Sequence, residues 1–315
     1  MSAHAHHDHQ AHDHQSHAGH HHAPASFGKA FAIGIALNLA YVLGEAYYGI
    51  TANSLSLLAD AGHNLGDVLA LAAAWLAALL GKRPPSKRFT YGLRGSSILA
   101  ALGNAVLLLV LTGGIAWEAI LRLRDPQSTG GNVIVAVAAI GILVNGITAL
   151  LFMSGRKHDL NIKGAFWHMA ADALVSLAVV IGGALILWTG WVWLDPAISL
   201  VVSAVIVVGT WSLLRDSLHL SLDAVPPGVD ESAVHAFLIR LPGVTEVHDL
   251  HIWGMSTTET ALTAHLVRPD APLDDDLLGH ACEELKAHFN IGHATLQVEN
   301  GRGAHACALQ PSEVV

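Results

Sequence analysis

The stretch LLADAGHNLGD, Leu57–Asp67, places a histidine and a carboxylate one helical turn apart inside an apolar segment. An α-helix advances about 3.6 residues per turn, so His63 and Asp67 share one face of the predicted helix and can converge on a single ion. Asp60 precedes them on much the same face. Ionisable groups are expensive in a bilayer, and within a membrane segment they mark an ion path, a proton relay or a ligand site.

A second copy of the spacing lies in Gly164–Leu177, GAFWHMAADALVSL, where His168 and Asp172 again stand four residues apart in an apolar helix. One such pair alone is explained equally well by a polar contact between neighbouring helices. Two pairs supply two imidazoles and two carboxylates, which is the ligand number of four-coordinate zinc and suits divalent first-row ions. The duplication therefore favours an intramembrane metal site.

The composition indicates a membrane protein. Of the 315 residues, 52% are hydrophobic and 13% are charged, and the mean hydropathy is +0.47, whereas an ordinary soluble domain has about 25% charged residues. The formal charge of −9 offers no basic patch for nucleic acid. Cys282 and Cys307 form no CxxC motif, so we expect both to be reduced, without a disulfide or a thiolate metal site.

Six apolar stretches are long enough to cross about 30 Å of hydrocarbon at roughly 20 residues each. They predict an all-α bundle of six transmembrane helices within residues 27–215, near 27–50, 56–80, 96–120, 132–154, 164–188 and 193–214. Basic residues concentrate between the second and third spans and between the fourth and fifth, so we expect those loops in the cytoplasm, although Arg122 and Arg124 run against this rule. Six spans then place both termini in the cytoplasm.

The two ends of the chain are expected to be disordered. The first 22 residues contain ten histidines and almost no apolar side chains. These histidines are dispersed among Asp, Gln and Ala, unlike an expression tag, and the apolar centre of a signal peptide is absent. We expect residues 1–26 to form a cytoplasmic tail that binds metal weakly, and residues 301–315 to form a second disordered tail.

Several polar residues within the spans carry weaker signals. Asn38, Asn104 and Asn145 are explained by hydrogen bonds between helices, or they line a cavity. Glu45 is harder to dismiss, because a carboxylate in lipid is expensive. We expect Glu45 or Asp60 to relay protons or to neutralise a charged partner.

Residues 216–300 have the character of a soluble domain. Pro226-Pro227-Gly228 marks the break from the membrane segments. The patterns that follow predict a helix from Asp230 to Leu241, strands Val244–Trp253 and Glu259–Val267, a helix Leu273–Phe289 and a strand His293–Glu299. This αββαβ order predicts a small α+β sandwich with helices on one face of the sheet.

Alternation along these strands locates a second group of histidines. The leucines of the second strand point to the core, which leaves His265 on the opposite face, and the same parity turns His293 and Glu299 outward. His248 and His251 are expected on opposite faces of the first strand, so one of them joins the group. A second metal site and a solvated sheet face with chance histidines both fit this pattern.

Together, LLADAGHNLGD, FWHMAADALVS and GVTEVHDLHIWGM, with TALTAHL and HATLQVE, resemble the cation diffusion facilitator family of divalent-metal transporters over about Phe27 to Glu299. The resemblance implies a homodimer, a ferredoxin-like cytoplasmic domain for metal sensing and dimerisation, and metal export in exchange for protons. By position, the transport site falls on His63, Asp67, His168 and Asp172, in the version of members that prefer zinc. The metal-binding positions of the regulatory domain in relatives fall on His248, His265 and Glu299.

The chain departs from the family pattern in three places. Residues 82–95 contain no His, Asp or Glu, so the extra metal site that some relatives hold in this loop is expected to be missing. Ser97 stands where many members carry a glutamate. Eukaryotic members usually carry a His-rich insert in the loop between the fourth and fifth helices, whereas the His-rich tract of this chain lies at the N-terminus. This difference favours a bacterial plasma membrane.

Proton antiport follows from the ligand chemistry, because zinc needs neutral imidazole and ionised carboxylate and so competes with protons at the same atoms. We expect zinc as substrate and regulator, without an organic cofactor. An intramembrane metalloprotease would need HExxH, which does not occur, so no enzyme activity is expected. A haem protein would leave the aspartates unexplained. A passive divalent-metal channel, and a transporter that prefers cadmium, cobalt, iron or manganese, are the alternatives.

Overall fold

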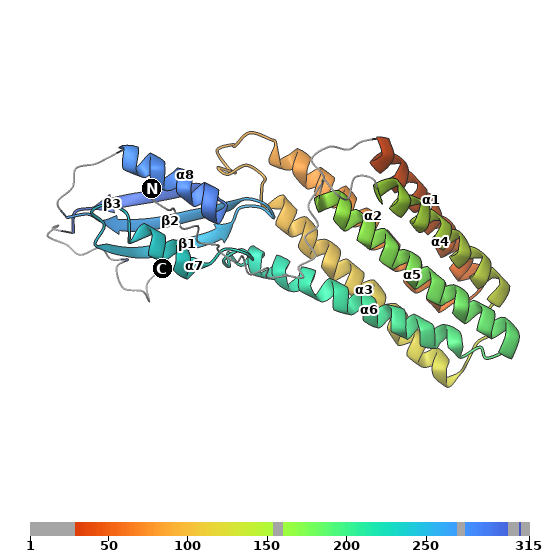
Figure 1. The fold of residues 1–315 in the computed structure, drawn as a ribbon. Coiled ribbons are helices and arrows are strands. Elements are labelled where there is room, and N and C mark those ends of the chain that lie inside the picture. The colour runs from red at the N-terminus through yellow and green to blue at the C-terminus, as the bar shows by residue number, and fades with distance from the viewer. Residues whose placement is uncertain (1–28, 154–159, 270–274, 302–308, 310–315) are drawn as a thin grey trace, which may run out of the picture.

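A computed structural model describes residues 29–153, 160–269, 275–301 and 309 (Figure 1). The expected tails 1–26 and 301–315 therefore lie almost wholly outside the described residues, as does Cys307. The membrane part contains six long helices, α1 Lys29–Thr51, α2 Leu55–Gly81, α3 Ser96–Arg124, α4 Gly131–Met153, α5 Leu160–Thr189 and α6 Leu194–Ser221.

Five helices of the described chain are long and apolar enough to cross a membrane: α2, α3 and α6 over their full lengths, α4 over Gly131–Leu150 and α5 over His168–Thr189. A spanning role for α1, the first of the six expected spans, stays a prediction. Large apolar side chains such as Val110, Trp117, Val208 and Trp211 are exposed on the outside of the bundle. Such a surface suits lipid, where a soluble protein would present polar groups.

The helices pack in two groups that α2 joins. Helices α1, α2, α4 and α5 enclose one apolar core, which includes Leu57, Ile134 and Val179. Helices α2, α3 and α6 enclose another, which includes Leu108 and Ile206. Because α2 contributes to both cores, a residue on α2 can reach side chains of either group.

The start of α2 is fixed by a carboxylate from a distant part of the chain. Ser54 is the N-cap of α2 and accepts a hydrogen bond from the Leu57 backbone N–H. Asp195, in the first turn of α6, is fully buried and accepts hydrogen bonds from Ser54 Oγ at 2.6 Å and Leu55 N at 2.7 Å, and also from the backbone N–H and the hydroxyl of Ser56. A negative charge at a helix N-terminus satisfies otherwise unpaired N–H groups and opposes the helix dipole.

The C-terminal domain has the αββαβ order expected from the sequence. It consists of α7 Glu231–Leu238, β1 Glu246–Gly254, β2 Thr260–Val267, α8 Asp275–Phe289 and β3 Ile291–Glu299. The sheet order is β1-β2-β3, with β1 antiparallel and β3 parallel to β2. Leucines of α7, β2 and α8 form its core, on one face of the sheet. The ferredoxin-like description of this small sheet domain stays a prediction.

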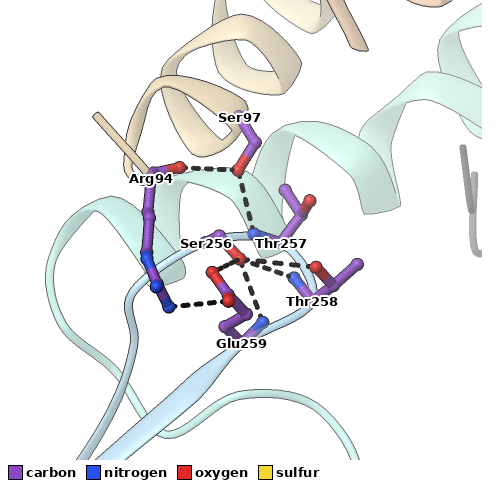
Figure 2. A network of polar contacts seen from close by, with 6 residues as sticks. All are labelled: Arg94, Ser97, Ser256, Thr257, Thr258 and Glu259. Atoms are coloured by element: carbon purple, nitrogen blue, oxygen red, sulfur yellow. Dashed lines mark hydrogen bonds and ion pairs between the residues drawn. The ribbon is translucent and has the colours of Figure 1, made fainter. Parts of the chain in front are cut away.

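The two domains touch through the connection between β1 and β2 (Figure 2). Arg94, just before α3, donates to Glu259 Oε1 at 2.7 Å. The backbone N–H of Thr257 donates to Ser97 Oγ at 3.1 Å, and the Ser97 hydroxyl donates to the Arg94 carbonyl. Ser97, at the start of α3, is thus part of the contact between the membrane helices and the C-terminal domain.

Candidate metal centres

Helices α2 and α5 bring together the four side chains that the duplicated spacing singles out. Across the helices, His63 Nε2 lies 3.3 Å from Asp172 Oδ1, and His168 Nε2 lies 3.1 Å from Asp67 Oδ2. Within each helix, the one-turn spacing gives 3.7 Å between His63 and Asp67, and 3.6 Å between His168 and Asp172. Each imidazole therefore faces both carboxylates.

These distances suit a small divalent ion. Ligand atoms about 2.0–2.1 Å from a tetrahedral zinc stand roughly 3.3 Å from one another, and the four His–Asp separations are 3.1–3.7 Å. His63, Asp67 and Asp172 offer ligand atoms within 4.8 Å of one another, and His168 stands at the edge of this group against the two carboxylates. Without an ion, the same atoms can pair as His–Asp contacts, which is the structural alternative.

The centre is closed on one side and open on the other. The Asp172 side chain is only 2% exposed, whereas the exposed fractions of His63, Asp67 and His168 are 20%, 22% and 32%. Asp172 therefore forms the buried wall of the centre, and His168 forms its most accessible edge. An ion entering between α2 and α5 would lose its water gradually, exchanging it for protein ligands.

Glu45 and Asp60 lie in the closed part of the bundle. Both side chains are fully buried. Tyr41 donates a hydrogen bond to Glu45 Oε1 at 2.6 Å, and Ser176, one turn after Asp172 on α5, donates to Asp60 Oδ2 at 3.2 Å. The two carboxylates thus form a polar layer next to the metal centre and apart from it.

A second group gathers in the sheet of the C-terminal domain. His248 and His265 stand opposite each other in the β1–β2 register, with ring centroids 5.1 Å apart. Glu299, on β3, places Oε1 2.9 Å from His265 Nδ1 and Oε2 3.7 Å from His248 Nε2. The exposed fractions are 5% for His248 and 11% for His265. Three ligand atoms from these residues lie within 4.8 Å of one another, as a metal site requires.

A β-bulge in β1 changes the expected position of His251. His248 pairs with His265 and His251 pairs with Thr263, so three residues of β1 span two residues of β2. Asp249, with a positive φ of 50°, is at this bulge. The expectation that His248 and His251 lie on opposite faces is therefore wrong, because the extra residue turns both toward the His265 face.

Asp249 is a member of this group that strand parity alone does not find. Its Oδ1 lies 2.8 Å from His251 Nε2 and its Oδ2 lies 3.4 Å from His265 Nε2. A regular strand would have placed it on the core side, with Val247. An aspartate within a strand is itself a signal of irregular backbone, because aspartate is depleted in strands and tolerates positive φ.

The structure does not bring His293 to this group. It has the predicted parity, but it pairs with Ala261, four residues along β2 from His265. At about 3.3 Å per residue, that separation is roughly 13 Å. Its ring instead meets Tyr91, from the segment before α3, with centroids 5.5 Å apart. Alternation along a strand predicts the face of the sheet on which a residue lies. It does not predict the register between strands, which decides the neighbours of that residue on the face.

Comparison with known proteins places this architecture among transporters of metal cations. The model of the cation efflux transmembrane domain matches residues 31–220, and that of the cation efflux protein cytoplasmic domain matches residues 226–301. The chain therefore belongs to the cation diffusion facilitator family, whose members are cation efflux proteins and not enzymes.

Three bacterial relatives show the range of cargo named in this family. The metal cation efflux system protein CzcD of Cupriavidus metallidurans is 36% identical over 91% of each chain. The zinc transporter ZitB of Escherichia coli is 37% identical over 85% of this chain and 86% of its own. The cadmium, cobalt and zinc/H(+)-K(+) antiporter of Bacillus subtilis is 32% identical over 89% and 92%. The chain is thus a membrane protein of divalent-metal efflux.

Proposed function

We propose that this protein exports divalent metal, with zinc as the main substrate, from the cytoplasm in exchange for protons, through the centre formed by His63, Asp67, His168 and Asp172. The observation that carries the proposal is the convergence of two imidazoles and two carboxylates with His–Asp separations of 3.1–3.7 Å. Mixed nitrogen and oxygen ligands favour zinc and its neighbours over magnesium or calcium.

Exchange for protons follows from the same four atoms. Zinc binds neutral imidazole and ionised carboxylate, so a proton on any ligand opposes metal binding. Histidine titrates near neutral pH, with an ordinary pKa of about 6.5, and is the better coupling group. The Bacillus subtilis relative is named as a zinc/H(+)-K(+) antiporter, which supports protons as the counter-ion.

We further propose a homodimer in a bacterial inner membrane with both termini in the cytoplasm. The match to a cytoplasmic domain of dimeric cation efflux proteins and the bacterial relatives support it. The orientation rests on the basic loop after α2, which contains Lys82, Arg83, Lys87 and Arg88.

Transport against a zinc gradient tests the function. Purified protein in liposomes should accumulate zinc uphill when an opposing pH gradient is imposed, and collapse of that gradient with a protonophore should release the zinc. A passive channel would only equilibrate zinc. Competition by cadmium, cobalt and manganese in the same assay establishes the metal preference.

We propose that His248, His265, Asp249 and Glu299 form a cytoplasmic zinc sensor. These residues come from three strands, so an ion bound there ties the strands together. The β1–β2 connection that follows the first histidine carries Glu259, whose carboxylate binds Arg94 beside α3. A change in the sheet can therefore reach the membrane helices through this contact.

The isolated cytoplasmic domain, residues 221–315, is expected to fold without metal, to dimerise, and to compact when zinc is added. It has its own core, so folding does not depend on the ion. Small-angle scattering with and without zinc measures the compaction. His265→Ala should lose the response, and His288→Ala, an exposed histidine on α8, should keep it. If the scattering profiles of the unmodified domain without zinc and at saturating zinc were identical, these histidines would be ordinary side chains on a solvated sheet face.

A further inference from the structure

A polar layer beside the metal centre contains two carboxylates that the four-ligand site does not use. Glu45 of α1 and Asp60 of α2 are neighbours, and both are fully buried. Each has one oxygen that accepts a hydroxyl hydrogen bond, from Tyr41 or from Ser176. The other oxygen of each, Glu45 Oε2 and Asp60 Oδ1, is buried and accepts no hydrogen bond from a donor among the described residues, and the two carboxyl groups interact with each other.

Two amide side chains extend this layer. Asn64, one turn after Asp60, is 4% exposed and interacts with the Glu45 carboxyl group. Asn145 of α4 is fully buried, and both polar atoms of its amide lack a hydrogen-bond partner in the described chain. Gly141, one turn earlier on the same face of α4, lies so close that a Cβ would collide with the Tyr41 hydroxyl. Helix α4 therefore closes directly over the layer.

Two adjacent, fully buried carboxylates cannot both carry their charge without a compensating cation. Like charges disfavour each other's ionised form, and burial adds a large desolvation penalty. The titratable groups that face the pair are Tyr41 on α1, His63 on α2 and Asp172 on α5, and α4 contains no charged residue. The hydroxyls of Tyr41 and Ser176 stabilise one negative charge, and the second must be neutralised.

The ligand atoms around Glu45 and Asp60 indicate which cation neutralises the second negative charge. The layer offers carboxylate, amide and hydroxyl oxygens, and no imidazole of its own. Oxygen ligands do not compete well for zinc against the two imidazoles of the neighbouring centre. A proton or a monovalent cation fits such a set better than the transported metal.

We propose that Glu45 and Asp60 form a counter-cation site, distinct from the metal centre, that holds one proton or one monovalent cation. The proposal rests on the proposed antiport function and adds a second position for a counter-ion, besides the protons that compete with zinc at the four ligands. Asp60 precedes His63 on α2 by about one turn, and Ser176 follows Asp172 on α5 by one turn, so the two sites share both helices at a separation of about 5.4 Å along their axes. Positive charges at that distance repel each other through a low-dielectric interior.

Mutual exclusion of the two ions would couple their movements. Zinc arriving at the four-ligand centre displaces the counter-cation, and the counter-cation returns when zinc leaves. The two monovalent candidates differ in chemistry, because a proton is held on one carboxyl oxygen and potassium needs several oxygen ligands, and they draw on different gradients. The name of the Bacillus subtilis relative contains both ions.

The test separates zinc exchange from coupled transport in liposomes that contain the full-length protein. Exchange of labelled for unlabelled zinc, at equal pH and equal potassium, needs only the metal centre. Uphill zinc accumulation is driven in one arm by a pH gradient without potassium, and in the other by a potassium gradient at equal pH. Glu45→Gln and Asp60→Asn should keep zinc exchange and lose uphill accumulation by about 10- to 100-fold, the range of a coupling free energy between two sites.

Glu118→Gln is the matched control, because Glu118 is a carboxylate of the membrane domain that pairs with Arg122 near the end of α3. It should keep both activities. Loss in the pH arm identifies the proton as the counter-ion, and loss in the potassium arm identifies potassium. Full uphill transport by both variants would overturn the proposal, as would loss of zinc exchange together with accumulation, which would make the pair structural. Failure of the unmodified protein to accumulate zinc in either arm would instead overturn the proposed antiport.

Discussion

Replacing Asp172 by asparagine should stop zinc transport while the protein stays folded. Asp172 is the most buried of the four ligands and lies 3.3 Å from His63 and 3.6 Å from His168. The asparagine leaves one carboxylate beside two imidazoles, so the site loses a negative charge and keeps only a neutral, weaker amide oxygen as its fourth ligand. Changes in partners that only orient metal ligands already cost about 10–100-fold in affinity, and we expect a loss of at least about 100-fold for a ligand itself.

The same result is expected for alanine at His63, Asp67 or His168. Zinc flux in proteoliposomes measures it, and size-exclusion elution in detergent shows that the variants are folded. Asp216→Asn is the control, because this carboxylate lies on α6 and pairs only with Arg215 among the described residues. Full transport by any two of the four ligand variants would rule out this site.

Removing the carboxylate of Asp195 should give the largest loss of stability in the membrane domain. Its two oxygens accept hydrogen bonds from four donors at the start of α2, two of them backbone N–H groups. In Asp195→Ala the two backbone N–H groups are left buried without an acceptor, and the hydroxyls of Ser54 and Ser56, 3.1 Å apart, keep only each other, at about 1–3 kcal/mol for each donor left unpaired. Relaxation of the helix end recovers part of that cost, so we expect a loss on the order of 4 kcal/mol.

Thermal unfolding in detergent, followed by tryptophan fluorescence, measures this loss. A decrease of 4 kcal/mol corresponds to a fall in Tm of roughly 10 °C for a domain of this size. Asp195→Asn keeps one acceptor oxygen and should lie between alanine and the unmodified protein. Asp216→Ala removes a partly exposed carboxylate of the same helix and should change Tm little. Equal melting of Asp195→Ala and the unmodified protein would show that water replaces the carboxylate.

The approach of His63, Asp67, His168 and Asp172 was predictable because its geometry is mostly local. A histidine and an aspartate four residues apart meet on any helix. The spacing therefore predicts two of the four His–Asp contacts, those within α2 and within α5. That α2 and α5 face each other was predictable only because the same His–Asp spacing occurs in both helices. Asp195 gave no such signal, because its partners at Ser54–Ser56 are about 140 residues away and no spacing links them.

In the cytoplasmic sheet, alternation worked where the strands are regular. It placed His265 and Glu299 on one face, and the structure joins them. It failed in β1, because a bulge at Asp249 adds a residue and turns His251 to the same face as His248. The contact between Arg94 and Glu259 was also out of reach, because each residue alone is an ordinary exposed charge.

The two helices that carry the four ligands are otherwise weakly connected. Helix α5 packs mainly on α4, and α2 packs mainly on α3 and α1, so α2 and α5 touch over only a short stretch. A metal ion bound at their crossing would add a direct link between α2 and α5 that exists only while the ion is present. The cargo then strengthens the conformation that holds it, by mass action, and weakens it on departure. In each transport cycle the link between α2 and α5 would form when the ion binds and be lost when the ion leaves.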